Sequence, residues 1–347
     1  MGAGVGDRGT YEPISPGGCF QHSLESAGPR PQGNPNTPLT SSARGLSPVG
    51  WYARVMKSSR LPWIAVLTLA TACVNVVTER GEEPAERVLR VALCQLSVSG
   101  DYAGNMQAVD RALGLAASDG ADLACFPEAC LFGWVNPDAH QLADSIPGPT
   151  SDRLGELARR HGLMVAIGVA EREGGRLYDS ALLIDRDGGI LLRHRKVNIL
   201  SELMEPPYTP GSDASASVVD TRLGRIGMLI CADTFQDVTV GEIAAAGPQV
   251  VLVPYGWAAP LQDWPQHGAN LHSWVAHTAR RVQAPVVGVD AIGEIEHGPW
   301  TGYLYGGQSV VCDRTGEVIL VLADREPEVR VIEIALEAPS AATARVP

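Results

Sequence analysis

The sequence predicts an α/β domain in which helices pack on mixed β-sheets, and two observations support this prediction. Apolar runs of strand length alternate along the chain with segments whose apolar residues recur at helical spacing. Turn-forming residues also separate several pairs of short apolar runs, as β-hairpins require. Mixed strands with interspersed helices are typical of one layered α/β domain and not of two independent domains.

The predicted elements begin with a strand at 88–96 and a helix whose apolar face carries Met106, Val109, Leu113 and Ala116. Gly120 stands where a glycine often ends a helix, because it adopts the left-handed conformation without strain. A buried strand at 122–126 follows. The other expected helices are 151–160, 238–246 and 269–282, and the other expected single strands are 163–169, 250–253 and 285–289.

Three β-hairpins are expected in addition. Their strands are 181–185 with 190–194, 216–220 with 225–230, and 308–312 with 318–321. Each connection contains a glycine or an aspartate at the point where a tight turn needs a positive φ.

Composition and charge restrict the classes of function. The chain has 347 residues, of which 45% are hydrophobic and 19% charged, so one large domain or two ordinary ones can bury a sizeable core. A formal net charge of −12 repels a phosphate backbone, which argues against a nucleic-acid partner. The 7 cysteines are odd in number and show no C-x-x-C spacing, which argues against a disulfide framework or a zinc site. His267, His272 and His277 are spaced by five and do not share a helix face, so no metal is expected.

The first part of the chain differs from the rest. Residues 1–55 are rich in Gly, Pro and Ser and lack hydrophobic periodicity, so we expect them to be disordered or absent from the mature protein. In the segment 56–73, Lys57 and Arg60 precede a short apolar run that ends at Cys73. The run is too short for a membrane span, which needs roughly twenty residues.

This segment resembles a bacterial lipoprotein signal, in which Cys73 would carry the lipid. If translation starts at Met56, the protein would lie in the cell envelope with a lipid anchor as its only membrane contact. The alternatives are a cytoplasmic protein and a short apolar segment that is buried or disordered. The charged stretch 74–87 is interpreted as a tether.

Three residues of chemical interest stand at the ends of predicted strands: Glu128, Lys196 and Cys231. Taken singly, each also fits an ordinary role, as a solvated loop acid, a basic strand edge or a small buried cysteine. Cys231 lies at a strand-to-helix junction, where backbone N–H groups and the helix dipole can stabilise a thiolate.

The order Glu128, Lys196, Cys231 at strand ends resembles the nitrilase superfamily, also called the carbon–nitrogen hydrolases. Supporting motifs follow each of the three residues and open the last hairpin: Gly133-Trp134, Tyr208-Thr209-Pro210-Gly211, Leu252-Val253-Pro254 and Gly306-Gly307-Gln308-Ser309. Each motif is weak alone, whereas the ordered set is specific. The resemblance implies a four-layer α-β-β-α sandwich over residues 88–337, a homo-oligomer (a dimer or larger), and no metal or organic cofactor.

The resemblance also implies a role for each residue. Glu128 would be the general base and later the acid, and Cys231 the nucleophile that forms a thioester or thioimidate. Lys196 and the backbone N–H of Ala232 would stabilise the developing negative charge. Glu205 matches a second glutamate that orients Lys196 or the water, with Glu202 as its competitor. The aromatic residues Trp134, Tyr255 and Trp257 would line the substrate pocket or simply pack in the core.

The favoured reaction is hydrolysis of a small amide. A nitrile is disfavoured because Ala232-Asp233 follows Cys231 where nitrilases tend to have Trp-Glu. An N-carbamoyl substrate is disfavoured because Thr234-Phe235-Gln236 offers no arginine for its carboxylate. A biotinidase- or pantetheinase-like amidase stays open, as does a non-catalytic binding protein on this fold. A papain-like protease is excluded, because the histidines show no signature of its base.

Overall fold

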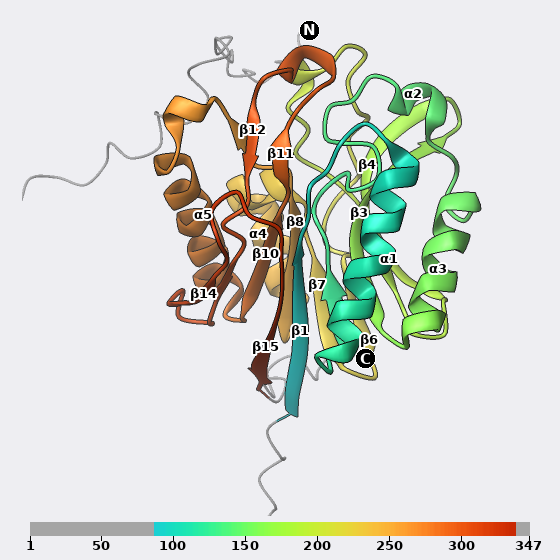
Figure 1. Ribbon diagram of the computed structural model, residues 1–347. Helices are drawn as coiled ribbons and strands as arrows, with labels where there is room; N and C mark the ends of the chain where they lie inside the picture. Colours follow the sequence, from blue (N-terminus) through green and yellow to red (C-terminus); the bar gives the residue numbers. More distant parts are fainter. Residues whose placement is uncertain (1–86, 338–347) are drawn as a thin grey trace, which may run out of the picture. The chain divides into compact units, whose positions relative to one another are not determined.

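The computed structural model describes residues 87–337, which lie within one compact unit, Val77–Pro347 (Figure 1). The expected disordered segment 1–55, the signal-like segment 56–73 and nearly all of the tether 74–87 lie outside the described residues. Within 87–337, no helix combines the length and the apolar character needed to cross a bilayer.

The first of two large sheets has six strands in the order β15-β1-β2-β3-β4-β5. Its strands are β1 (Arg87–Gln95), β2 (Leu123–Cys125), β3 (Met164–Glu173), β4 (Arg176–Ile184), β5 (Ile190–Arg195) and β15 (Glu328–Leu336). β1, β2 and β3 are parallel, whereas β4, β5 and β15 each pair antiparallel with their neighbour. β15 pairs with β1 along its whole length, so the two ends of the described chain lie side by side.

The second sheet also has six strands, in the order β14-β13-β10-β8-β7-β6. They are β6 (Val218–Thr221), β7 (Gly224–Met228), β8 (Val250–Tyr255), β10 (Val286–Asp290), β13 (Val310–Cys312) and β14 (Val318–Val321). The central strands β7, β8 and β10 are parallel. A third, small sheet joins β9 (Ala258–Ala259), β11 (Ile292–Glu294) and β12 (Leu304–Gly306).

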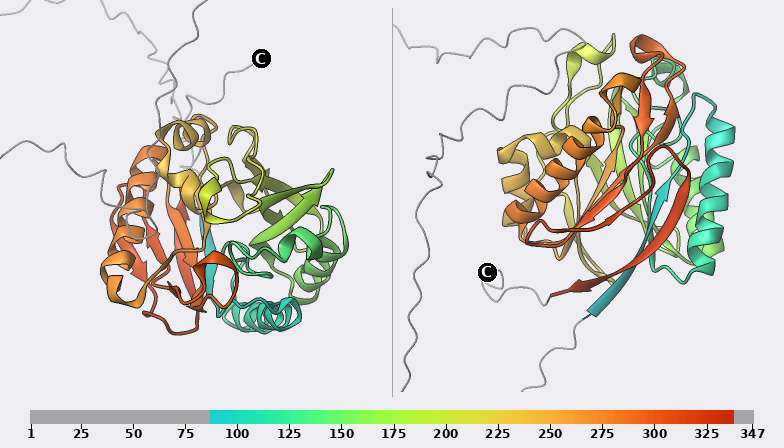
Figure 2. Two further views of the ribbon diagram at one scale, coloured as in Figure 1. Left: turned by 90° about the horizontal axis from the view of Figure 1, so that it is seen from above. Right: turned by 60° about the vertical axis from the view of Figure 1, so that its left-hand side comes forward.

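Helices cover the outer face of each large sheet. α1 (Tyr102–Ser118) and α3 (Pro149–His161) lie on the first sheet, and α4 (Asp237–Ala245) and α5 (Gln266–Val282) lie on the second, as Figure 2 shows from two further directions. The amphipathic pattern accounts for α1, since Met106, Val109 and Leu113 are buried on one face. The arrangement confirms the expected four-layer α-β-β-α sandwich.

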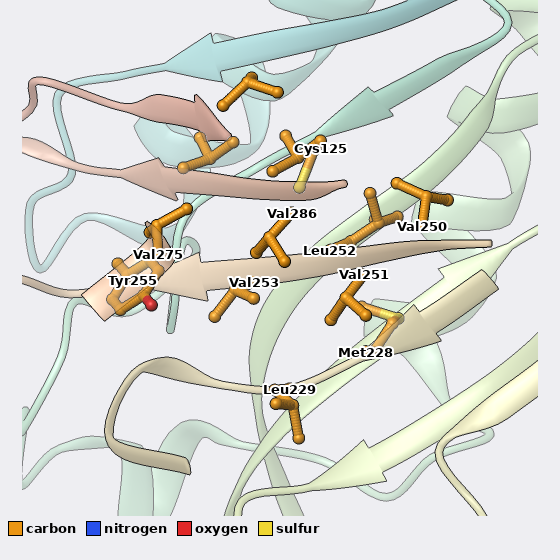
Figure 3. Close-up of a cluster of buried hydrophobic side chains, with 14 of the residues drawn as sticks. Cys125, Met228, Leu229, Val250, Val251, Leu252, Val253, Tyr255, Val275 and Val286 are labelled. Carbon is orange, nitrogen blue, oxygen red and sulfur yellow. The ribbon is translucent and has the colours of Figure 1, made fainter. Parts of the chain in front are cut away.

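The core between the two sheets is made of strand side chains that alternate toward it. Leu89, Val91 and Leu93 of β1 face this layer, and the remaining β1 residues of the core face the helix α1. From the second sheet, Met228 and the run 250–253 belong to the same cluster of buried side chains, which also includes residues of α4 and α5 on the other face of that sheet and is drawn in part in Figure 3. The strands of the second sheet are apolar on both faces because α4 and α5 cover the face that points away from β1.

Most of the expected elements are present, and the differences have local causes. The turns of the three hairpins contain Gly188, Gly224 and Gly316, all with positive φ, as expected. The strand expected at 181–185 was predicted too short, because β4 (Arg176–Ile184) begins five residues earlier, after a turn made by Gly174 and Gly175. α2 (Ala139–Leu142), β15 and the small third sheet were not predicted from the sequence.

Candidate active site

Glu128 lies in a tight loop after β2, and the end of β8 holds it there. Its backbone N–H donates to the carbonyl of Tyr255 at 3.1 Å, and its Oε2 accepts the N–H of Gly256 at 2.7 Å. The side chain is 1% exposed. A Cβ at Gly168 of β3 would lie 2.5 Å from the Glu128 Cα, so only a glycine lets β3 and this loop pack together.

Lys196 follows β5 directly and points into the same buried region. Its backbone N–H donates to the carbonyl of Asp179 at 2.8 Å, and its ammonium donates to the Glu128 carboxylate and to Asp179 Oδ2, the latter at 3.3 Å. Burial alone lowers the pKa of Lys196, but the neighbouring acidic side chains, the Glu128 carboxylate first, outweigh it and raise that pKa well above its usual value. Lys196 therefore carries a positive charge.

Cys231 begins the short 3-10 helix η2 (Cys231–Phe235), which follows β7. Its φ of +39° lies in the left-handed region, where non-glycine residues are strained, and its carbonyl accepts the Thr234 hydroxyl at 2.7 Å. Burial and then the Glu128 carboxylate raise the pKa of the Cys231 thiol, although Lys196 and the N–H of Gly256 oppose them. The resting sulfur is therefore a neutral thiol that needs a base.

A buried carboxylate joins this helix to the chain after β5. Asp233 Oδ2 accepts the N–H of Ile230 at 3.0 Å and His194 Nε2 at 2.8 Å, and its Oδ1 accepts the N–H groups of Val197 at 2.9 Å and Asn198 at 2.8 Å. Burial opposes ionisation, but the hydrogen bond and charge of His194 lower the pKa of Asp233 below its usual value. Asp233 thus fixes the Cys231 segment relative to Lys196.

Sequence reasoning missed two residues of this cluster, Asp179 and Asp233. Asp179 sits in mid-strand on β4, where an acid in an apolar run gave no signal of function. In the sequence, Asp233 served only as part of the Ala232-Asp233 pair after Cys231, which argues against a nitrile substrate. Their partners lie far away along the chain, so only the pairing of β4 with β5 and the packing of η2 bring them together.

Three aromatic residues singled out from the sequence are all buried. Trp134 packs against Gly256, where an added Cβ would lie 3.1 Å from its side chain and 3.0 Å from Glu128 Oε2. The Tyr255 hydroxyl lies 3.2 Å from the Thr234 hydroxyl, beside Cys231. Trp257 stacks on the His267 ring of α5 with centroids 4.5 Å apart, and its backbone N–H donates to Asp290 Oδ1 at 2.7 Å. Trp134 therefore packs on Gly256, the residue whose N–H binds the Glu128 carboxylate.

Ala232 is fully buried, and its carbonyl accepts the Asn198 side chain at 2.7 Å. Glu205, by contrast, is exposed after the short helix η1 (Ser201–Leu203), as is its competitor Glu202. Within residues 87–337, no hydrogen bond or ion pair joins Glu205 to the buried cluster, so its role stays a prediction. The same part of the chain contains no group of three or more His, Cys, Asp or Glu side chains placed to hold a metal ion.

Comparison with known proteins identifies the family. The sequence model of the carbon–nitrogen hydrolase family matches residues 90–343. An (R)-stereoselective amidase of Pseudomonas sp. is 30% identical over 72% of this chain and 86% of its own length. A nitrilase of Paraburkholderia phymatum is 33% identical over 42% of this chain and 47% of its own length. The chain thus spans about half the length of such nitrilases.

A solved structure supports the same assignment. An alanine variant of an amidase of the nitrilase superfamily from Nesterenkonia is 25% identical, with a TM-score of 0.62 over 76% of this chain and 95% of that one. Its fold and the match to the family model agree with the layered architecture described above. The chain belongs to the carbon–nitrogen hydrolase family, the nitrilase superfamily.

Proposed function

We propose that the chain hydrolyses the carbon–nitrogen bond of a small amide, with Cys231 as nucleophile, Glu128 as general base and Lys196 as electrostatic stabiliser. One observation carries this proposal: a neutral thiol, a carboxylate and a charged ammonium are buried together at the ends of β7, β2 and β5. Burying two opposite charges is costly, so their place beside a thiol supports a catalytic use.

In the first half-reaction, Glu128 takes the proton of the Cys231 thiol as the sulfur attacks the amide carbon. Negative charge develops on the amide oxygen, where the Lys196 ammonium and the N–H of Ala232 stabilise it. Glu128 then passes its proton to the nitrogen, the carbon–nitrogen bond breaks, and ammonia or an amine departs. A thioester on Cys231 remains.

In the second half-reaction, Glu128 takes a proton from water while the water oxygen attacks the thioester carbon. The carbon–sulfur bond breaks, the carboxylic acid leaves, and the sulfur regains a proton from Glu128. The reaction consumes one amide and one water and restores the starting state of the site.

One comparison favours an amide over a nitrile. The amidase of Pseudomonas sp. is 30% identical over 72% of this chain, whereas a nitrilase of Arabidopsis thaliana that matches a similar share, 71%, is 26% identical. The side chains of Cys231, Glu128 and Lys196 are at most 5% exposed, which favours a small substrate. A nitrilase, an N-carbamoyl hydrolase and a non-catalytic binding protein remain as alternative outcomes of the test.

The test is intact-mass spectrometry of the wild type and Cys231→Ala after exposure to amides, nitriles and N-carbamoyl compounds, with ammonia release measured in parallel. Fluoroacetamide serves as a covalent probe, because its acetamide moiety adds to the active-site cysteine of a glutamate-to-glutamine variant of the Nesterenkonia amidase. We expect an acyl adduct and ammonia release with amides from the wild type and from Cys130→Ala, a variant of another buried cysteine. Adducts that persist in Cys231→Ala, or no turnover of any compound, would contradict the proposal.

We also propose that the protein forms a homo-oligomer and that Cys73 carries a lipid anchor. Light scattering on the purified protein tests the first. Mass spectrometry of protein from the native cell tests the second, since lipidation at Cys73 requires a chain that begins at that residue. An intact segment 1–72 in that material would exclude the anchor.

A further inference from the structure

The Lys196 ammonium has three N–H donors, and the structure accounts for two of them. One donates to Glu128 Oε1 and one to Asp179 Oδ2 at 3.3 Å. The third is left for the oxygen of a substrate on Cys231, whose sulfur is among the groups that act on the pKa of Lys196. The direction of this third N–H depends on both acceptors, because one hydrogen bond alone lets an ammonium rotate.

Asp179 also holds the backbone of Lys196. Its backbone carbonyl accepts the N–H of Lys196 at 2.8 Å, while its carboxyl group accepts from the ammonium. Asp179 lies on β4 and pairs with Ala170 of β3, so the central part of the first sheet holds it in place. The side chain is 1% exposed, which leaves it no freedom to follow a displaced lysine.

We propose that Asp179 is a positioning residue of the proposed amidase site, and that it acts as a neutral hydrogen-bond acceptor that aims the Lys196 ammonium at the substrate oxygen. This inference rests on the proposed function, since it assigns Lys196 its orientation during the reaction. Asp179 touches no reacting atom itself.

The surroundings of Asp179 support its neutral form. Burial and then the neighbouring Glu128 charge raise the pKa of Asp179 well above its usual value, although Lys196 opposes them. The second oxygen, Oδ1, is buried, and no N–H or O–H group of residues 87–337 donates to it. A proton on Oδ1 would satisfy this oxygen and allow it to donate to the Glu128 carboxylate, one of the groups that raise the pKa of Asp179.

An asparagine reproduces this neutral arrangement, because its carbonyl oxygen can accept from Lys196 and its amide can donate to Glu128. An alanine removes both. Asp179→Asn is therefore expected to keep kcat within about threefold of the wild type, whereas Asp179→Ala lowers it by about 10- to 100-fold with KM nearly unchanged. Glu171→Gln is the matched control. Glu171 is a fully buried acid of the adjacent strand that binds Arg193 and Arg195, away from Cys231.

The experiment measures kcat and KM on the best amide found, the rate of Cys231 alkylation by iodoacetamide, and the melting temperature of each variant. The alkylation rate needs no substrate, so it remains readable if the proposed amidase activity fails. We expect this rate to fall about 10-fold in Asp179→Ala and to recover in Asp179→Asn, because a misplaced ammonium stabilises the thiolate less. Glu171→Gln is expected to lose thermal stability and to keep the wild-type kcat and alkylation rate.

Two results would overturn the inference. An Asp179→Ala variant with wild-type kcat and alkylation rate would show that Lys196 needs no second acceptor. An Asp179→Asn variant as slow as Asp179→Ala would show that a negative charge, and not a neutral acceptor, is required at this position. A wild type that is alkylated at Cys231 but turns over no amide would instead contradict the proposed function alone.

Discussion

At the scale of single residues, the chemistry depends on how Glu128 is held. Its carboxylate bonds both to the Lys196 ammonium and to the N–H of Gly256, so each oxygen is fixed before any substrate arrives. The same contacts place the carboxylate beside the Cys231 thiol, whose pKa it raises. A base with this geometry can take the thiol proton without prior rearrangement.

Replacing Glu128 by glutamine tests this role. The amide keeps the size of the side chain but cannot accept the thiol proton, so we predict that kcat falls by about 10²- to 10⁴-fold. Single-turnover acylation followed by mass spectrometry measures the loss, and circular dichroism checks that the variant is folded. A folded Glu128→Gln protein that acylates at the wild-type rate would exclude Glu128 as the base.

The cysteines should differ in reactivity for an electrostatic reason. Burial raises the pKa of Cys130 to about 12, and it raises that of Cys312 to about 11. Cys231 differs from both because the buried carboxylate of Glu128 and the ammonium of Lys196 both act on its thiol. We therefore predict that iodoacetamide near neutral pH labels Cys231 faster than the other cysteines of residues 87–337. Peptide mapping of partly labelled protein gives the order, and equal labelling of Cys130, Cys312 and Cys231 would contradict it.

At the scale of secondary structure, β3 supports the loop that carries Glu128. The carbonyl of Gly168 accepts the N–H of Cys130 at 2.9 Å, and the N–H of Gly168 donates to the carbonyl of Pro127 at 3.1 Å. A Cβ at this position would meet backbone atoms of residues 127–129 at 2.5 to 2.7 Å. The strand and the loop can therefore stay in contact only if this residue has no side chain.

Gly168→Ala is predicted to damage both stability and activity. Forcing the loop away should cost about 1–3 kcal/mol in the free energy of unfolding and displace Glu128 from Gly256. Gly241→Ala in α4 is the control, because its Cβ would meet only Arg281 at an ordinary 3.5 Å. Urea unfolding measures the change in stability of both variants, and amide turnover gives their kcat. If Gly168→Ala matched the control in both, the close packing would have no consequence.

The connection between η2 and β5 should make stability depend on acid pH. Because the pKa of Asp233 is lowered on folding, its charge stabilises the native state fully above the unfolded pKa of about 3.9. That contribution is lost as the pH falls through the lower, folded pKa.

Asp233→Asn is therefore predicted to cost about 3 kcal/mol near neutral pH, since the neutral amide leaves backbone N–H groups poorly satisfied. The difference from the wild type should stay constant down to about pH 4 and shrink below it. Urea unfolding of both proteins over the acid range measures this dependence. A difference that widens toward acid pH would show that Asp233 is not the ionised partner of His194.

At the scale of the whole molecule, the site forms where the ends of strands from both sheets meet. Glu128 follows β2 and Lys196 follows β5 in the first sheet, while Cys231 follows β7 and Gly256 follows β8 in the second. Carboxyl ends of strands that run in one direction gather at one edge of a sheet. Packing two such sheets face to face therefore brings a base, an ammonium and a thiol together from distant parts of the chain.

This geometry explains what the sequence could and could not predict. The apolar runs before Glu128, Lys196 and Cys231 are local signals, so the strand ends and their residues were found. The strands β9 and β11 have two or three residues and carry no periodicity. The partners of Asp179 and Asp233 depend on sheet register and on the packing of one segment over another, which no local pattern encodes.

The packing of the two sheets makes a last prediction about stability. Leu89 of β1 is 1% exposed, pairs with Ile334 of β15 and faces the core between the sheets. Leu115 of α1 is 57% exposed on the outer layer. Leu89→Ala should cost about 2–5 kcal/mol in the free energy of unfolding, because it leaves a cavity where two sheets meet. Leu115→Ala should cost about 0.5 kcal/mol or less.

Leu89 lies at the start of β1, far along the strand from the residues of the site. The folded Leu89→Ala protein should therefore keep the wild-type kcat, in contrast to Gly168→Ala, which alters the loop of Glu128. Urea unfolding at a temperature where both leucine variants are folded gives the two stability differences, and amide turnover at the same temperature gives kcat. If Leu89→Ala and Leu115→Ala lost the same free energy of unfolding, burial between the two sheets would contribute no more to stability than the exposed face of α1.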